Sequence, residues 1–201
     1  TAFLTSIPAE KTGHITSPMA NPSSPIDALV GTLLDVGITH VVGIPDNTSA
    51  PLFDVLMECD RPSLITVTRE GEAFALAAGL WLGGSSPLVV IQNTGLLEAG
   101  DALRGTAVRM AAPIPIVVTG RGYTKTEAAG VALDHPLTRD VLIRPDVDSV
   151  SLLTQPTLDA WGIPHTVCRS SADAAESIRS TVRAAEDQGR PVALLLIGEM
   201  C

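Results

Sequence analysis

The chain has 201 residues, a length typical of one domain with a full hydrophobic core. Hydrophobic residues make up 45% of it and aromatic residues only 3%, so the core must be aliphatic, as in α/β proteins with parallel sheets. The formal net charge of −9 and the scarcity of aromatic rings disfavour nucleic acid or an anionic membrane as a partner.

The first residues differ in composition from the rest of the chain. Residues 1–23 mix Pro, Ser, Thr and Gly without a continuous apolar run, so we expect a flexible N-terminal arm rather than a signal peptide. Residues 24–201 are expected to form the domain, beginning with Ser24-Pro25 as the start of a helix that ends near Gly37. The apolar stretches are too short to span a bilayer, and we expect a cytoplasmic protein.

Short apolar strands alternate with helices along the domain. The expected strands are 40–44, 64–67, 88–91, 114–118, 165–167 and 192–196. The expected later helices are about 49–59, 70–82, 96–111, 150–161 and 171–187, and the segment 123–144 is less regular. This alternation predicts a single three-layer α/β/α domain with a mainly parallel sheet of about six strands.

Ligands of open parallel sheets bind beyond the carboxyl ends of the strands. Three segments place glycine or polar side chains there, namely residues 43–47, 68–72 and 92–95. The sequence lacks a glycine-rich dinucleotide fingerprint, a phosphate-binding loop ending in Gly-Lys-Ser/Thr and a nucleophile elbow. Its three cysteines are too scattered for a zinc site. The commonest nucleotide-binding interpretations therefore fail.

Two acidic residues, Glu70 and Glu72, stand in the first turn of the expected helix 70–82. The helix dipole stabilises an acidic side chain there by about 0.3–1 kcal/mol, and this explanation suffices for Glu72. Small residues follow, so the helix can pack closely either on the sheet or on a second subunit at a shared active site; they are Ala73, Ala75, Ala77, Ala78 and Gly79.

The segment from Glu70 to Gly79 resembles the Glu-x-x-Ala-x-x-x-Ala-x-Gly signature of the pyrimidine-binding domain of thiamine diphosphate enzymes. Three further segments resemble the phosphonopyruvate and sulfopyruvate decarboxylases of that superfamily: Gly43-Ile44-Pro45-Asp46, Gln92-Asn93-Thr94-Gly95-Leu96 and Leu158-Asp159-Ala160-Trp161-Gly162-Ile163-Pro164. Their order and spacing match from about residue 26 to residue 197, so the resemblance covers nearly all of the expected domain.

The resemblance implies thiamine diphosphate as cofactor and Glu70 as the carboxyl that activates it. This cofactor becomes a nucleophile when its thiazolium carbon loses a proton to its own aminopyrimidine, and a carboxyl bonded to the pyrimidine nitrogen N1′ favours the tautomer that takes the proton. Further roles are implied for cofactor contacts (Gln92, Asn93, Thr94), for substrate contacts (Pro45, Asp46, Asn47) and for a second catalytic residue (His135).

Each of those residues also has a structural explanation. Asn93 and Asp46 follow strands, where such side chains bond their own backbone in turns. A lone histidine such as His135 is commonly a surface residue. Arg104, Arg109 and Arg121 can meet an anionic substrate or simply be solvated. The residues alone do not decide between these alternatives.

Two departures from the family pattern matter. After Gln92-Asn93 the related decarboxylases usually read Gly-Leu-Gly-Asn, whereas this chain continues from Gly95 as Gly-Leu-Leu-Glu-Ala-Gly-Asp. The Gly-Asp-Gly and Asn segment that binds the diphosphate and Mg²⁺ in this superfamily is absent. The resemblance therefore implies a partner β subunit that carries the diphosphate-binding domain and Mg²⁺, in an α₂β₂ assembly.

The leading hypothesis is the α subunit of a thiamine diphosphate-dependent decarboxylase that converts 3-phosphonopyruvate or 3-sulfopyruvate into carbon dioxide and an aldehyde. Three alternatives stay open: another 2-oxoacid enzyme such as an acetolactate-type ligase, a non-catalytic regulatory or scaffold module of the same fold, and an ordinary nucleotide-binding α/β domain. The presence of Glu70 disfavours the second, and the missing phosphate loops disfavour the third.

Overall fold

The computed structural model describes residues 24–198, so the expected N-terminal arm lies outside the described residues. Its centre is one six-stranded sheet in the order β2-β1-β3-β4-β6-β5, and every neighbouring pair of strands is parallel. The strands are β1 His40–Gly43, β2 Ser63–Thr66, β3 Pro87–Gln92, β4 Pro115–Thr119, β5 His165–Cys168 and β6 Val192–Leu196. The predicted sheet of six strands is confirmed.

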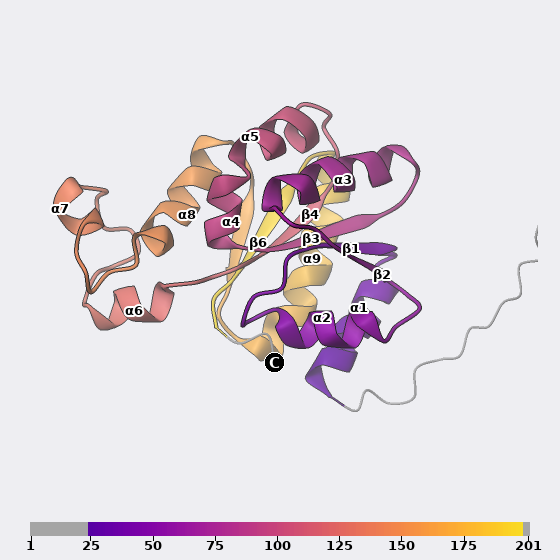
Figure 1. Ribbon diagram of the computed structural model, residues 1–201, viewed down its shortest axis with the longest axis horizontal. Helices are drawn as coiled ribbons and strands as arrows, with labels where there is room; N and C mark the ends of the chain where they lie inside the picture. The colour runs from indigo at the N-terminus through magenta and orange to yellow at the C-terminus, as the bar shows by residue number, and fades with distance from the viewer. Residues whose placement is uncertain (1–23, 199–201) are drawn as a thin grey trace, which may run out of the picture.

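Helices cover both faces of the sheet, which gives three layers (Figure 1). On one face lie α1 Pro25–Asp35, α2 Ala50–Met57, the 3₁₀ turn η2 Ser171–Asp173 and α9 Ala174–Gln188. On the other lie α3 Glu70–Leu82, α4 Asn93–Glu98, α5 Gly100–Leu103 and α8 Ser149–Ala160. Each face has its own aliphatic core, and the central strands contribute alternate residues to the two.

The chain reverses its direction of travel across the sheet at β1. It runs from β1 outward to β2, and α3 then returns it past β1 to β3. The segment after β1 leads to α2 on one face, whereas Gln92 at the end of β3 leads directly into α4 on the opposite face. Such a switch point opens a crevice at the carboxyl ends of the strands, where ligands of open α/β sheets bind.

The prediction of one continuous helix over 96–111 was wrong. The structure begins it earlier, as α4, breaks it at Ala99, and continues it as α5 and a π-helical turn η1, Arg104–Val108. Gly100 is the first residue of α5, and the Trp161 ring packs so closely against it that a Cβ would lie 2.6 Å from a ring carbon. The segment predicted as less regular contains two short helices, α6 Tyr123–Ala128 and α7 Arg139–Leu142.

The start of the fold follows the predicted capping. Ser24 accepts a hydrogen bond from the Asp27 N–H at 3.1 Å, and Pro25 is the first helical residue of α1. None of the helices within residues 24–198 has the length and hydropathy needed to cross a membrane.

Candidate functional site

The two acidic residues at the start of α3 have different surroundings. The Glu72 carboxylate accepts hydrogen bonds from the Thr68 backbone N–H and hydroxyl, both at 3.0 Å, and so stabilises the start of the helix. These bonds lower the pKa of Glu72. Glu70 is the first residue of α3 and is half-buried. Within residues 24–198 its carboxyl has neither a hydrogen-bond partner nor an ion-pair partner, so it is available to a ligand.

The Glu70 side chain lies against Gly95 in α4. A Cβ at Gly95 would overlap the Cγ, Cδ and Oε1 atoms of Glu70, so the missing side chain makes room for the carboxyl. Gly95 is buried inside a helix, where glycine costs about 1 kcal/mol relative to alanine. A glycine at this place, directly after a strand, was the sequence signal for this contact, but its partner was not predictable.

Asn93 connects the end of β3 to the loop after β4. Its side chain is fully buried, accepts from the Arg121 N–H at 3.1 Å and donates to the Arg121 carbonyl at 3.0 Å. The same amide nitrogen also donates a hydrogen bond to the Thr154 hydroxyl oxygen at 3.2 Å. The local turn expected as the structural alternative for Asn93 is not found; its side chain instead bonds the loop after β4 and the Thr154 hydroxyl. A cofactor contact by Asn93 stays a prediction.

Gln92 and Thr94 flank Asn93 at the same edge. The exposed Thr94 hydroxyl donates to the Gln92 side-chain oxygen at 3.0 Å. This bond orients the amide and leaves its nitrogen without a partner among the described residues. Gln92 can therefore donate hydrogen bonds to a ligand in the crevice.

The loop after β1 is held by Asp46. One carboxylate oxygen accepts from the Thr48 N–H at 2.8 Å, and the other accepts from the hydroxyls of Ser49 at 2.9 Å and Thr119 at 2.7 Å. Turn chemistry therefore occupies the Asp46 carboxylate and connects this loop to the end of β4. Pro45 and Asn47 on either side are exposed. Substrate binding by these three residues stays a prediction.

His135 does not meet Glu70 within this chain. It is exposed in the loop between α6 and α7, and its Nδ1 lies 2.9 Å from the Pro136 carbonyl oxygen. Figure 1 shows α6 and α7 at the opposite end of the molecule from α3. A catalytic role for His135 stays a prediction, and it needs another chain or a bound ligand to bring the residue to the site.

One face of α3 has no covering element in the described part of the chain. The exposed positions begin one turn after Glu70 and continue to the end of the helix: Ala75, Leu76 (37% exposed), Gly79 and Leu82 (66% exposed). Apart from its chain neighbours and the backbone of α3, no described atom lies within 4 Å of where a Gly79 Cβ would be. The face is apolar, and at about 3.6 residues per turn it lies on the side of α3 away from Glu70.

Comparison with known proteins identifies the family. Residues 26–139 match the thiamine pyrophosphate enzyme, N-terminal TPP binding domain. The chain belongs to this family. The sheet edge at which the strands end, described above, therefore belongs to a thiamine pyrophosphate enzyme domain. The predicted family resemblance is confirmed.

The relatives include a much longer decarboxylase and a decarboxylase subunit of which nearly the whole length matches this chain. A phosphonopyruvate decarboxylase of Streptomyces viridochromogenes is 36% identical over 94 residues, which is 47% of this chain but only 24% of that protein. A sulfopyruvate decarboxylase subunit alpha of Methanothermobacter thermautotrophicus is 26% identical over 170 residues, 85% of this chain and 93% of that subunit. The chain thus spans about a quarter of the first relative and nearly all of the second.

Solved structures agree on the fold. A thiamine diphosphate-dependent 4-hydroxybenzoylformate decarboxylase of Rhodococcus jostii matches with a TM-score of 0.61 at 19% identity, over 87% of this chain and 30% of that one. A benzoylformate decarboxylase of Polynucleobacter necessarius gives the same TM-score at 20% identity, over 86% of this chain and 29% of that one. The predicted α/β fold of this domain is thereby confirmed.

Proposed function

We propose that this chain is the α subunit of a two-subunit, thiamine diphosphate-dependent 2-oxoacid decarboxylase. Its substrate is 3-phosphonopyruvate or 3-sulfopyruvate, and its products are carbon dioxide and the corresponding aldehyde. The proposal is supported by similarity to phosphonopyruvate decarboxylases and by a match over 93% of a separate sulfopyruvate decarboxylase α subunit.

The observation that carries the proposal is the position of the Glu70 carboxyl. It is half-buried, lacks partners in the described residues, and lies over Gly95 at the switch point of the sheet. When bound, thiamine diphosphate supplies a nucleophilic carbon that accepts the 2-oxoacid and the electrons left by decarboxylation. Glu70 holds and shares a proton at N1′ of the pyrimidine ring, which is the role of a positioned general acid–base.

The other predicted residues extend the same site. Gln92 presents an amide nitrogen without a partner, and Thr94 orients it, so these two fit the edge of an aminopyrimidine ring. Asn93 contributes by holding the backbone of the adjacent loop at Arg121. In this proposal Pro45, Asp46 and Asn47 form the loop nearest the substrate. His135 is kept as a residue that acts only in the assembled enzyme.

A partner β subunit holds the diphosphate and Mg²⁺ in this proposal. Within residues 24–198, no group of three or more His, Cys, Asp or Glu side chains is placed to hold a metal ion. The exposed apolar face of α3 lies on the side of the helix away from Glu70 and offers a surface that a second subunit can bury. The closed symmetry usual among oligomers favours an α₂β₂ assembly.

The test is activity of the assembled complex. The chain is co-expressed with the product of a neighbouring reading frame that carries the Gly-Asp-Gly and Asn segment, and aldehyde release is measured with thiamine diphosphate and Mg²⁺. Glu70→Gln keeps the size of the side chain but removes the ionisable proton, and we expect turnover to fall by about 100-fold or more.

Glu72→Gln is the matched control, because Glu72 lies two residues further along the same helical turn and bonds only its own chain. We expect its activity at neutral pH to equal that of the wild type. Retained turnover in Glu70→Gln, or equal losses in both variants, would contradict the assignment of Glu70.

A further inference from the structure

Three arginines follow strands of the sheet and therefore stand at its carboxyl edge: Arg69 after β2, Arg121 after β4 and Arg169 after β5. All three lie within ion-pair distance of a carboxylate, and two of them are paired closely. Arg69 is hydrogen-bonded to Glu98, and Arg169 pairs with Glu127 at 2.9 Å. β2 and β5 are also the two edge strands, whereas β4 lies beside β3 at the centre of the sheet. Arg121 is thus the central cation of this edge.

The backbone of Arg121 is fixed to the candidate site. Both its N–H and its carbonyl are hydrogen-bonded to the buried Asn93 side chain, at 3.1 and 3.0 Å. Asn93 is two residues before Gly95, about 3 Å along the helix axis, and Gly95 lies against the Glu70 carboxyl. A continuous set of contacts therefore connects the Arg121 backbone to Glu70.

The turn around Arg121 has little freedom. Gly122 has a φ of +85°, and a Cβ there would meet the Asp148 side chain at 2.5 Å. At Gly120 a Cβ would approach the Tyr123 ring and the Leu196 carbonyl oxygen at 3.0 and 3.1 Å. Arg121 is thus held between two glycines that leave little room for a side chain, which presets where its own side chain starts.

The Arg121 guanidinium is held only loosely. Its Nε lies 3.5 Å from an Asp148 carboxylate oxygen, and its side chain is 61% exposed. Among the described residues its two terminal nitrogens have no partner, so the forked face of the group is open to an oxyanion.

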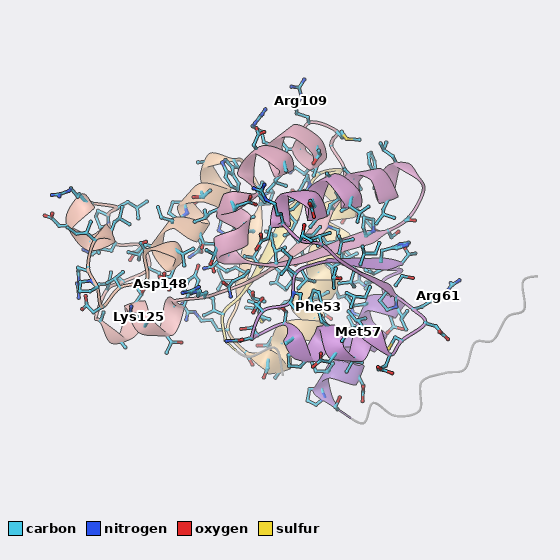
Figure 2. All side chains as sticks on the ribbon, viewed as in Figure 1. Phe53, Met57, Arg61, Arg109, Lys125 and Asp148 are labelled. Atoms are coloured by element: carbon cyan, nitrogen blue, oxygen red, sulfur yellow. The ribbon has the colours of Figure 1, made fainter. Side chains whose placement is uncertain are left out.

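The two other arginines that the sequence left open lie elsewhere. Arg104 pairs with Asp101 at 2.6 Å on the outer side of α5. Arg109 follows η1, and Figure 2 shows it projecting from the top of the molecule, far from Asp148, the partner of Arg121. These positions do not place either side chain at the end of a strand.

We propose that Arg121 is the specificity-determining residue that binds the second anionic group of the substrate, the phosphonate or sulfonate one carbon beyond the 2-oxoacid. This inference rests on the function proposed above. In a protein of net charge −9, a doubly anionic substrate needs such a local cation. The forked donors of Arg121 match the oxygens of either group, and the carboxylate of the 2-oxoacid stays free to leave as carbon dioxide.

The test is steady-state kinetics of the complex with 3-phosphonopyruvate, 3-sulfopyruvate and pyruvate, which lacks the second anion. In Arg121→Gln we expect KM for both doubly anionic substrates to rise about 10- to 100-fold, with kcat within about threefold. Any turnover of pyruvate should be unchanged. Arg121→Lys keeps the charge without the fork and should fall between. Arg109→Gln is the matched control and should retain wild-type KM values.

A binding arm separates this inference from the proposed function. Phosphonoacetate, which carries both anionic groups but no keto carbon, is titrated calorimetrically into the complex and into the chain alone, in wild type, Arg121→Gln and Arg109→Gln. The inference is supported if phosphonoacetate binds more weakly to Arg121→Gln than to both wild type and Arg109→Gln. That holds even if the wild-type complex decarboxylates none of the oxoacids, because such a result would overturn only the proposed function. Equal binding in all three proteins, or a KM increase that includes pyruvate, overturns the role of Arg121.

Discussion

The contact between Gly95 and Glu70 allows a sharp test, because one methyl group should displace a carboxyl without unfolding the protein. In Gly95→Ala the three atoms nearest the new Cβ all belong to the Glu70 side chain, at 2.1–2.3 Å. Non-bonded carbon atoms rest about 3.5–4.0 Å apart, so the carboxyl must move by more than about 1 Å. Glu70 is half-buried and can rotate toward solvent, so the move is open to it.

The expected effects on stability and on activity differ in size. Alanine is favoured over glycine inside a helix by about 1 kcal/mol, which offsets much of the roughly 1–3 kcal/mol that overpacking costs. The free energy of unfolding should therefore change by less than about 2 kcal/mol. A misplacement of about 1 Å at a catalytic group can lower a rate by about 100-fold, so we expect kcat to fall by about that factor.

The assay is turnover of the complex, together with the rate at which the cofactor's thiazolium carbon exchanges its proton for deuterium. Gly31→Ala in α1 is the control, since it is also a helical glycine and nothing lies within 4 Å of its Cβ position. If both changes act through one carboxyl, Gly95→Ala combined with Glu70→Gln should be no slower than Glu70→Gln alone. Wild-type exchange in Gly95→Ala, or multiplicative losses in the double variant, would refute the reasoning.

Two further predictions concern stability. Asn93→Ala deprives the Arg121 N–H and carbonyl of their partners, and we expect the free energy of unfolding in urea to fall by about 2 kcal/mol or more; an unchanged value would show that water replaces the amide. Glu72→Gln tests the helix start, because hydrogen bonds from Thr68 hold the pKa of Glu72 below its usual 4.5. The ionised form thus stabilises the fold above that pH and the contribution is lost as pH falls through the folded-state pKa, so the difference in Tm between variant and wild type should vanish in acid. A difference that is constant with pH would contradict this.

The sequence was sufficient for the sheet because its strands are short apolar runs separated by clear turn residues. The helix after β3 was harder, because apolar residues such as Leu96, Leu103 and Ala107 continue a helical period across the break at Ala99. Beside the break, the Trp161 ring packs against Gly100, and this ring comes from a distant part of the chain. Local pattern carries no information about such a contact.

The candidate site shows the same division. The first-turn position of Glu70 and the polar residues after the strands were visible in the sequence, and the dual explanations for Asp46 and Asn93 were too. Local partners, Thr48 and Ser49, realise the turn explanation for Asp46, whereas the partner of Asn93, Arg121, lies far along the chain. Sequence spacing therefore predicted the edge of the sheet where the candidate site lies, but not which side chains have free hydrogen-bonding groups there.

The Asn93 side chain extends the sheet beyond its last strand residue. Regular pairing of β3 with β4 ends at Gln92 and Thr119. Beyond it, the Asn93 side chain donates a hydrogen bond to the Arg121 carbonyl and accepts one from the Arg121 N–H, as a neighbouring strand would. The Arg121 residue is exposed in a loop, but its backbone N–H can lose its hydrogen bond only when the end of the central sheet opens. We expect its amide hydrogen to exchange with solvent on the slow timescale of a core strand, so the Arg121 backbone should keep its position whether or not a ligand is bound.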